Sequence, residues 1–281
     1  MKTVAVSAFF IFVSAFFSVP PAAQSLKAEE IVAKHLDSIG TKAKRDELKT
    51  LMALGYSEFE SRFPIVKGGG RAIVVSDPKN LFFVITLNSR EYPFEKIGYF
   101  NGKANLPFIA PGARSLLGLF IAEHEKILSE GLFGGSMSLR WPFFAAEKKL
   151  WIKASGTKKI DGRKMLAIEY VPSSGASNEF RIKLFFDADT FNHVRSEYHR
   201  EVVSGRVIFG QANQHANAVL TLTEEFSDFK TIDGFTLPHA YKVIFLSNSN
   251  TSANENRWGI NVAEYRVNQK LLPDFFTFDT K

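Results

Sequence analysis

The chain has 281 residues, of which 45% are apolar and 23% charged, a globular balance that excludes wholesale disorder and allows one large domain or two small ones. It contains no cysteine, which excludes disulfides, thiolate metal sites and a cysteine nucleophile. The net charge of +6 arises from 35 basic and 29 acidic residues without a dense cationic run, so we expect no nucleic-acid partner.

The N-terminal segment predicts a secretory signal peptide. Lys2 precedes an apolar run over 4–19, which falls short of the roughly 30 Å core of a bilayer and ends at two prolines. The small residues that follow suit cleavage, so we expect a signal peptide over 1–23, possibly reaching 25, and one domain over 24–281. No later stretch is apolar for long enough to span a membrane. A cysteine-free exported chain is typical of a bacterial periplasm, where we expect this protein.

A helix and then many strands follow. Ser25 can cap a helix whose apolar residues recur from Ala28 to Ile39, and Gly40 stands where that helix would end. The apolar period then changes to two, and Asn-Gly and Asp-Gly pairs mark hairpin turns, while Gly68-Gly69-Gly70 reads as a hairpin loop. About eleven strands are expected, near 50–63, 70–76, 81–88, 94–101, 148–158, 163–171, 179–187, 192–203, 217–228, 236–248 and 256–267. The pattern predicts a mainly β (α+β) fold with a single antiparallel sheet long enough to curl, covered by one or two helices.

Residues 113–130 interrupt the strands with a helical period. Their apolar residues fill one stripe of a predicted amphipathic helix, and His124 lies near the centre of that stripe. An aromatic run from Trp141 to Phe144 follows. The helix can belong to the core or form a lid over an apolar trough. The histidine in the stripe and the flanking glycines favour the lid.

The search for catalytic chemistry finds little. There is no nucleophile elbow, phosphate loop or dinucleotide motif, and no two metal-ligand side chains share a helix face at metal spacing. We therefore expect no catalytic residue, no metal and no cofactor. A secreted enzyme acting on a lipid or glycan stays an alternative, with Glu197, His199 and Glu224 or Glu225 as its candidates.

Three stretches together resemble the LolA/LolB superfamily of periplasmic lipoprotein carriers. They are the opening helix from Glu29 to Leu36, the Asp-Gly and Leu-Pro hairpin over 229–238, and the closing segment from Leu271 to Phe276. The resemblance implies a half-open, strongly curved barrel with an apolar concave face and a helical lid. It further implies that the concavity binds acyl chains of lipoproteins or of a similar lipid. The lid arginine of these carriers matches no one residue here, so no binding residue is carried over.

The composition is compatible with such a ligand. Each buried methylene is worth about 0.8 kcal/mol, so an acyl chain needs a sheltered apolar trough, and the many phenylalanines suit its lining. The prediction is a periplasmic carrier that moves lipid or lipoprotein acyl chains toward the outer membrane, with inner- or outer-membrane lipoprotein-sorting proteins as candidate partners. An envelope sensor or scaffold of the same fold is a further alternative. The residues expected to line the trough or its lid are Leu116, Leu117, Phe120, Ile121, His124, Ile127, Leu128, Trp141, Phe143 and Phe144.

Overall fold

The computed structural model describes residues 26–62, 65–145, 150–173, 175, 180–202, 218–249, 253–272 and 274–278. The predicted signal peptide lies outside the described residues and stays a prediction, as does the domain boundary after it. Within the described ranges, no helix has the length and apolar character needed to cross a bilayer.

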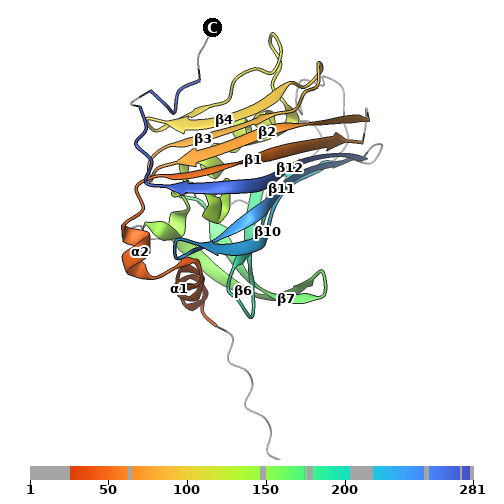
Figure 1. Ribbon diagram of the computed structural model, residues 1–281. Coiled ribbons are helices and arrows are strands. Elements are labelled where there is room, and N and C mark those ends of the chain that lie inside the picture. The colour runs from red at the N-terminus through yellow and green to blue at the C-terminus, as the bar shows by residue number, and fades with distance from the viewer. Residues whose placement is uncertain are drawn as a thin grey trace, which may run out of the picture.

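The described strands form one curved antiparallel sheet (Figure 1). Its order is β5-β4-β3-β2-β1-β12-β11-β10-β9-β8-β7-β6, so the chain meanders from β1 to β5, crosses to β6 and returns to pair β12 with β1. The twelve strands are β1 Leu51–Ser61, β2 Val66–Ser76, β3 Leu81–Thr86, β4 Phe94–Phe100, β5 Lys103–Asn105, β6 Trp151–Ile160, β7 Arg163–Val171, β8 Phe180–Asp187, β9 His193–Val202, β10 Ala218–Ile232, β11 Phe235–Ser249 and β12 Ala253–Val267. Among these strands β5 and β6 have a neighbour on one side only, which confirms the predicted half-open sheet.

Three hairpin turns lie at the predicted Asn-Gly and Asp-Gly pairs. Asn101-Gly102, Asp161-Gly162 and Asp233-Gly234 all have positive φ at both residues, the requirement of a two-residue hairpin. The prediction for Gly68 to Gly70 was wrong, because these glycines lie inside β2. The backbone carbonyls of Thr86 and Leu87 pass so close to Gly70 and Gly68 that a Cβ at either position would clash. A triple glycine here permits close approach of two chain segments and does not form a loop.

The N-terminal helix is present as α1, Ala28–Ile39, and a short α2, Lys42–Asp46, follows it. Lys27 precedes the first turn, and its N–H donates to Glu30. The predicted cap, Ser25, lies outside the described residues. The buried side of α1 includes His35, whose pKa is lowered to about 4 by burial. The ring is therefore neutral, and its Nε2 accepts a hydrogen bond from Trp141 Nε1 over 3.1 Å.

The segment that connects β5 with β6 contains what we call the insert, residues 106–145. The predicted single helix over 113–130 was wrong, because the insert holds two short helices, α3 Leu116–Glu123 and α4 Lys126–Ser129. The helix ends at His124, whose ring lies between those of Phe120 and Phe180, at centroid distances of 4.5 and 4.3 Å. The ring Nδ1 also donates to the Phe120 carbonyl. Two single turns complete the insert, η1 Gly135–Met137 and η2 Pro142–Phe144.

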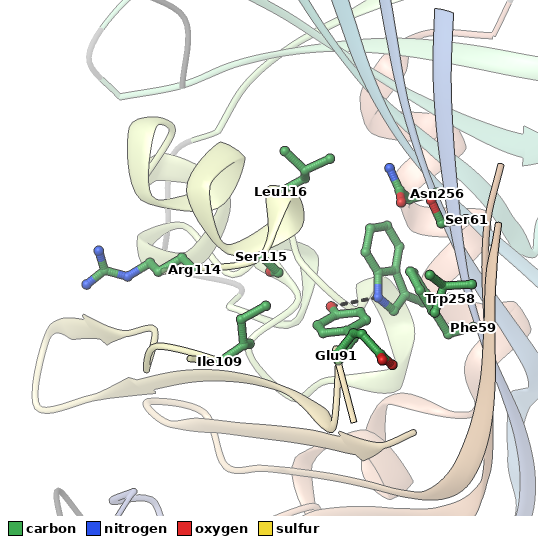
Figure 2. A pocket seen from close by; sticks show the side chains of 11 residues that line it. Phe59, Ser61, Glu91, Ile109, Arg114, Ser115, Leu116, Asn256 and Trp258 are labelled. Atoms are coloured by element: carbon green, nitrogen blue, oxygen red, sulfur yellow. Dashed lines mark hydrogen bonds between the residues drawn. The ribbon is translucent and has the colours of Figure 1, made fainter. Parts of the chain in front are cut away.

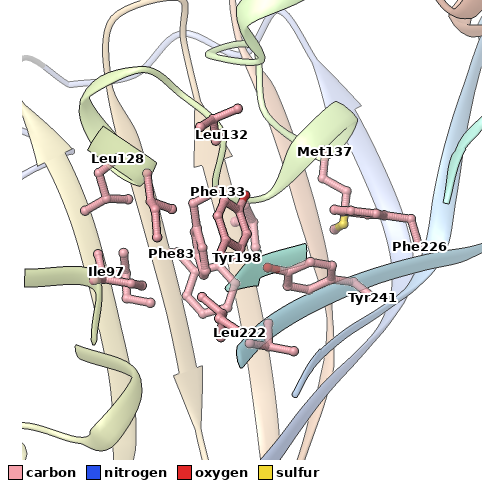
Figure 3. Close-up of a cluster of buried hydrophobic side chains, with 14 of the residues drawn as sticks. Phe83, Ile97, Leu128, Leu132, Phe133, Met137, Tyr198, Leu222, Phe226 and Tyr241 are labelled. Carbon is pink, nitrogen blue, oxygen red and sulfur yellow. The ribbon is translucent and has the colours of Figure 1, made fainter. Parts of the chain in front are cut away.

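The insert fills the concave side of the sheet (Figures 1 and 3). Figure 3 shows Leu128, Leu132, Phe133 and Met137 reaching from the insert toward side chains of the strands. The labelled strand residues that they meet are Phe83, Ile97, Tyr198, Leu222, Phe226 and Tyr241. The concavity of the half-open barrel is thus occupied by the chain's own residues.

Candidate functional site

An apolar cavity of about 270 Å³ lies between α3 and one end of strands β1 and β12 (Figure 2). Its size is near the lower limit of ligand pockets, which is about 300 Å³. The lining residues are Phe59, Ser61, Val66, Glu91, Tyr92, Ile109, Arg114, Ser115, Leu116, Asn256 and Trp258. We call this space the aromatic cavity.

The pairing of β1 with β12 builds the inner wall of the aromatic cavity. Phe59 pairs with Trp258 and Ser61 pairs with Asn256. Alternate residues of a strand share a face, so all four side chains stand on the concave side. The Phe59 ring lies 5.4 Å from the Trp258 ring and 4.7 Å from the ring of Tyr92.

A chain of hydrogen bonds ties this wall to the first turn of α3. Trp258 Nε1 donates to the Tyr92 hydroxyl over 2.9 Å, the dashed line in Figure 2, and that hydroxyl donates to Glu95. Burial raises the pKa of Glu95 to about 7, although hydrogen bonds from Ser115 and Tyr92 act against this shift. Ser115 is also the residue that caps α3, since its Oγ accepts from Gly118 N–H over 2.8 Å. The network anchors the start of α3 to the sheet.

Opposite charges lie among the lining residues of the aromatic cavity. Arg114 is held in place, because its Nε donates to the Leu106 carbonyl over 2.8 Å and its guanidinium lies 4.5 Å from the centre of the Phe108 ring. Figure 2 shows this guanidinium directed away from the aromatic wall, while Glu91 lies below Trp258. Phe59, Trp258, Ser61 and Asn256 of the inner wall carry no charge, and the carboxylate of Glu91 lies beside them.

A second buried carboxyl, Glu224 of β10, anchors the other part of the insert. It accepts hydrogen bonds from the hydroxyls of Tyr198 and Tyr241, over 2.7 and 2.5 Å, and from Gly134 N–H over 2.7 Å. Burial raises the pKa of Glu224 to about 7. Glu130 of the insert is satisfied in the same way, by the Tyr170 hydroxyl and by Ser173. Three carboxyls therefore connect the insert with the rest of the fold through hydrogen bonds.

A more polar cavity of about 410 Å³ lies beside His124. Its lining consists of Ala122, Glu123, His124, Glu125, Lys126, Pro172, Gly175, Phe180 and Arg200. Burial lowers the pKa of His124 to about 4, and the charge of Arg200, whose guanidinium donates to His124 Nε2, acts in the same direction. The charged rim makes this cavity less suited to an apolar ligand than the aromatic cavity.

The predicted site residues all belong to the insert, but few of them reach a cavity. Leu116 lines the aromatic cavity and His124 lines the polar one. Phe144 is half-buried. The others are packed in the core: Leu117, Phe120, Ile121, Ile127, Leu128, Trp141 and Phe143.

Sequence reasoning missed the aromatic wall. Phe59, Tyr92 and Trp258 come from segments far apart in the chain. Phe59 and Trp258 meet through strand pairing, and Tyr92 joins them from the connection before β4. The alternation of β1 and β12 could have placed Phe59 and Trp258 on an inward face, but alternation does not tell which strands are neighbours.

The residues named for an enzyme lie on two different faces of the sheet. Arg195 pairs with Glu197 over 3.3 Å and with Glu225 over 2.5 Å on the outer face of the sheet, whereas Glu224 points inward. His199 lies 3.4 Å from Glu201. Within the part of the chain that the structure describes, no three acidic or histidine side chains approach closely enough to hold a metal ion.

Comparisons with known proteins find similarity of structure only. No family model matches the sequence, and no curated protein matches it. A LolA superfamily protein from Nitrosomonas europaea is 11% identical with a TM-score of 0.48, over 90% of this chain and 99% of that one. An outer membrane lipoprotein-sorting protein domain from Vibrio parahaemolyticus is 12% identical with a TM-score of 0.44, over 87% of this chain and 95% of that one. Both are similarities of structure at low sequence identity.

Proposed function

We propose that this protein is a periplasmic carrier that binds the acyl chain of a lipoprotein or of another lipid in the aromatic cavity, for transport toward the outer membrane. The observation that supports this proposal is the cavity itself, where Phe59, Trp258 and Leu116 form apolar walls between the sheet and the insert. Such walls suit an acyl chain, because each methylene buried there gains about 0.8 kcal/mol. No catalytic group is needed for this role.

The insert limits how much of a lipid the cavity takes up. Leu116 contacts the acyl chain directly in this proposal, because its side chain borders the cavity. The deeper residues of the predicted stripe, such as Leu117 and Phe120, are fully buried and would meet lipid only if the insert moved away from the sheet. Transfer to and from membrane lipoprotein-sorting proteins is the step at which such a movement would serve the carrier.

Filling the cavity tests the proposal. Leu116→Trp places a large side chain into the space, and we expect the affinity for a fluorescent fatty acid to fall at least about tenfold. Leu272→Trp is the matched control, because Leu272 is 73% exposed and remote from the cavity lining. Thermal melting of both variants checks that they are folded. Equal probe affinity in the wild type and in Leu116→Trp would contradict the proposed site.

The native ligand can be sought directly. Native mass spectrometry of protein prepared from periplasm should reveal a copurifying lipid that is lost in Leu116→Trp. A sensor or scaffold of the same fold would in addition retain a membrane protein in a pulldown. Protein without lipid that also fails to bind the fatty acid would reject the carrier.

A further inference from the structure

The first loop of the insert exposes an unbroken apolar run. Residues 107–113, which we call the apolar loop, read Pro-Phe-Ile-Ala-Pro-Gly-Ala and contain no polar side chain. Phe108 is 51% exposed, residues 110–113 are exposed as well, and Ile109 is half-buried. Runs of exposed apolar residues are avoided in soluble proteins unless a function requires them. The apolar loop therefore has the character of a contact surface.

The apolar loop is held in shape by its own backbone. Ile109 N–H donates to the Ala113 carbonyl and Ala113 N–H donates to the Ala110 carbonyl, both over 2.9 Å. Pro111 and Gly112 stand at the centre of this turn, and Gly112 has a φ of 73°, which is typical of a type II turn. These backbone groups keep their hydrogen bonds when the loop leaves water, which lowers the cost of entering a lipid surface.

A second exposed apolar side chain lies at the same end of the sheet. Strands β1 to β4 are successive antiparallel neighbours, so the β1–β2 hairpin and the β3–β4 connection project from one end, at the right in Figure 1. β5 runs toward that end before the chain enters the apolar loop. Ile65, in the β1–β2 hairpin, is 79% exposed. Two segments of this end therefore present apolar side chains to the outside.

Both segments border the aromatic cavity. Ile109 of the apolar loop and Val66, which follows Ile65, belong to its lining. Figure 2 shows Ile109 and Arg114 across the cavity from Trp258. A surface that contacts this end of the molecule would accordingly lie next to the cavity.

The charges at this end are mainly positive. The segments 61–67, 87–93 and 106–115 contain four basic residues and one acidic residue, namely Arg62, Lys67, Arg90, Arg114 and Glu91. Carboxylates of adjoining strands pair with Arg62 and Lys67. Among the described residues, Arg90 and Arg114 form no ion pair. Their guanidinium groups can therefore approach the phosphate groups of lipids.

We propose that the apolar loop and Ile65 dock on the surface of a bilayer that contains anionic lipid. Phe108 enters the outer part of the acyl chains, and Arg90 and Arg114 meet the phosphates. The Arg114 guanidinium lies 4.5 Å from the centre of the Phe108 ring, so a cation and an apolar ring reach the interface together. A bilayer suits this surface better than a protein, because the loop has no hydrogen-bonding side chain that would select a protein partner. This docking goes beyond the proposed carrier role, since it depends on the loop and the cations and not on what the cavity holds.

Flotation with protein-free vesicles tests the docking. We expect the wild type to bind vesicles of equal parts phosphatidylethanolamine and phosphatidylglycerol at low salt, and to bind phosphatidylcholine vesicles at least about tenfold more weakly. Phe108→Asp should lower the partition into the anionic vesicles at least about tenfold, because a carboxylate resists transfer into acyl chains. Arg114→Gln should lower it about fivefold, the share of one cation near an anionic surface.

Two variants of the segment after β12 are matched controls. Leu272→Asp and Lys270→Gln make the same kinds of change at exposed residues, and the pairing of β1 with β12 places this segment at the opposite end of the sheet. Their partition should equal that of the wild type. Thermal melting checks that every variant is folded. The affinity of Phe108→Asp for a fluorescent fatty acid in solution should be unchanged, because Phe108 does not line the aromatic cavity.

An added tryptophan reports whether the loop enters the bilayer. Brominated acyl chains quench an indole only at short range. On binding to vesicles with such chains, Phe108→Trp should lose a larger share of its fluorescence than the wild type. Leu272→Trp should lose no larger share than the wild type.

The outcomes separate the docking from the carrier. Wild type that does not float with anionic vesicles would overturn the docking, and wild type that floats only with vesicles containing membrane proteins would overturn it in favour of a protein partner. Equal partition of Phe108→Asp and the wild type would overturn it as well. Wild type that floats as expected but binds no fatty acid would support the docking and reject the carrier.

Discussion

At the Glu224 end of the insert, a buried carboxyl bonded to two tyrosines is surrounded by tightly packed rings such as Phe133. At the Glu95 end, a buried carboxyl is bonded to Tyr92, which lines the aromatic cavity. Both carboxyls have a pKa raised to about 7 by burial, and both hold the insert. The same chemistry therefore anchors both ends, and only the packing around it makes one end a candidate receptor.

The largest expected effect is the difference in packing between the two ends. Phe133 is 1% exposed and lies 5.3 Å from the Phe83 ring, so Phe133→Ala should lower the free energy of unfolding by about 3–5 kcal/mol. Leu116 is half-buried beside existing space, and Leu116→Ala should cost about 1 kcal/mol. Urea unfolding measures both. Equal losses would show that the two ends are packed alike.

The two carboxyls predict a loss of stability as the pH rises. The pKa of Glu224 is raised from 4.5 to about 7, so its contribution is fully present below pH 4.5 and is lost as the pH rises through about 7. This change is on the order of 3 kcal/mol for a fully buried group. Glu224→Gln cannot titrate at this position. The free energy of unfolding, measured with urea between pH 4.5 and 8, should therefore decline less steeply in this variant than in the wild type. The decline that remains is the one caused by Glu95. An unchanged slope would mean that Glu224 is ionised at little cost.

Ligand binding should distinguish the two ends by a somewhat smaller effect. A lipid at one hundred times its Kd raises the free energy of unfolding by about 2.7 kcal/mol. Hydrogen exchange should then slow at Ser115 and Gly118 next to the aromatic cavity and change little at Gly134. Leu116→Trp should remove the effect. Protection concentrated at Gly134 would place the ligand at the wrong end.

The smallest effect is expected on the outer face. Glu225 follows Glu224 in the chain but pairs with Arg195 near the solvent. Ion pairs near the surface contribute little, so Glu225→Gln should change the free energy of unfolding by less than about 1 kcal/mol. A larger change would indicate that this ion pair is part of a more tightly coupled network.

The fold was largely predictable because it depends on local patterns. Strand alternation and the Asn-Gly and Asp-Gly turns specify the hairpins, and the structure has them at the predicted places. The insert was less predictable, since its apolar stripe continues past His124 although the helix ends there. At that end the histidine ring contacts Phe180, which is distant in the chain and could not be placed from the local pattern.

The candidate site was mostly beyond sequence reasoning. Leu116 was predicted to contact ligand and does line the aromatic cavity, but Trp258 and Asn256 were not considered. Their place in the cavity wall depends on which strand β12 pairs with. The sequence also left open which of Glu224 and Glu225 faces the core. A register shift by one residue exchanges the inner and outer faces of a strand.

The pairing of β1 with β12 also affects how the molecule folds. Leu51 is matched with Val267, so two strands near opposite ends of the described chain must meet before the sheet is continuous. Pairings this distant in sequence form slowly, and until β12 arrives β1 presents an unpaired edge to other chains. The nascent protein thus depends on its last strand to protect its first. A holding chaperone during synthesis would meet that need.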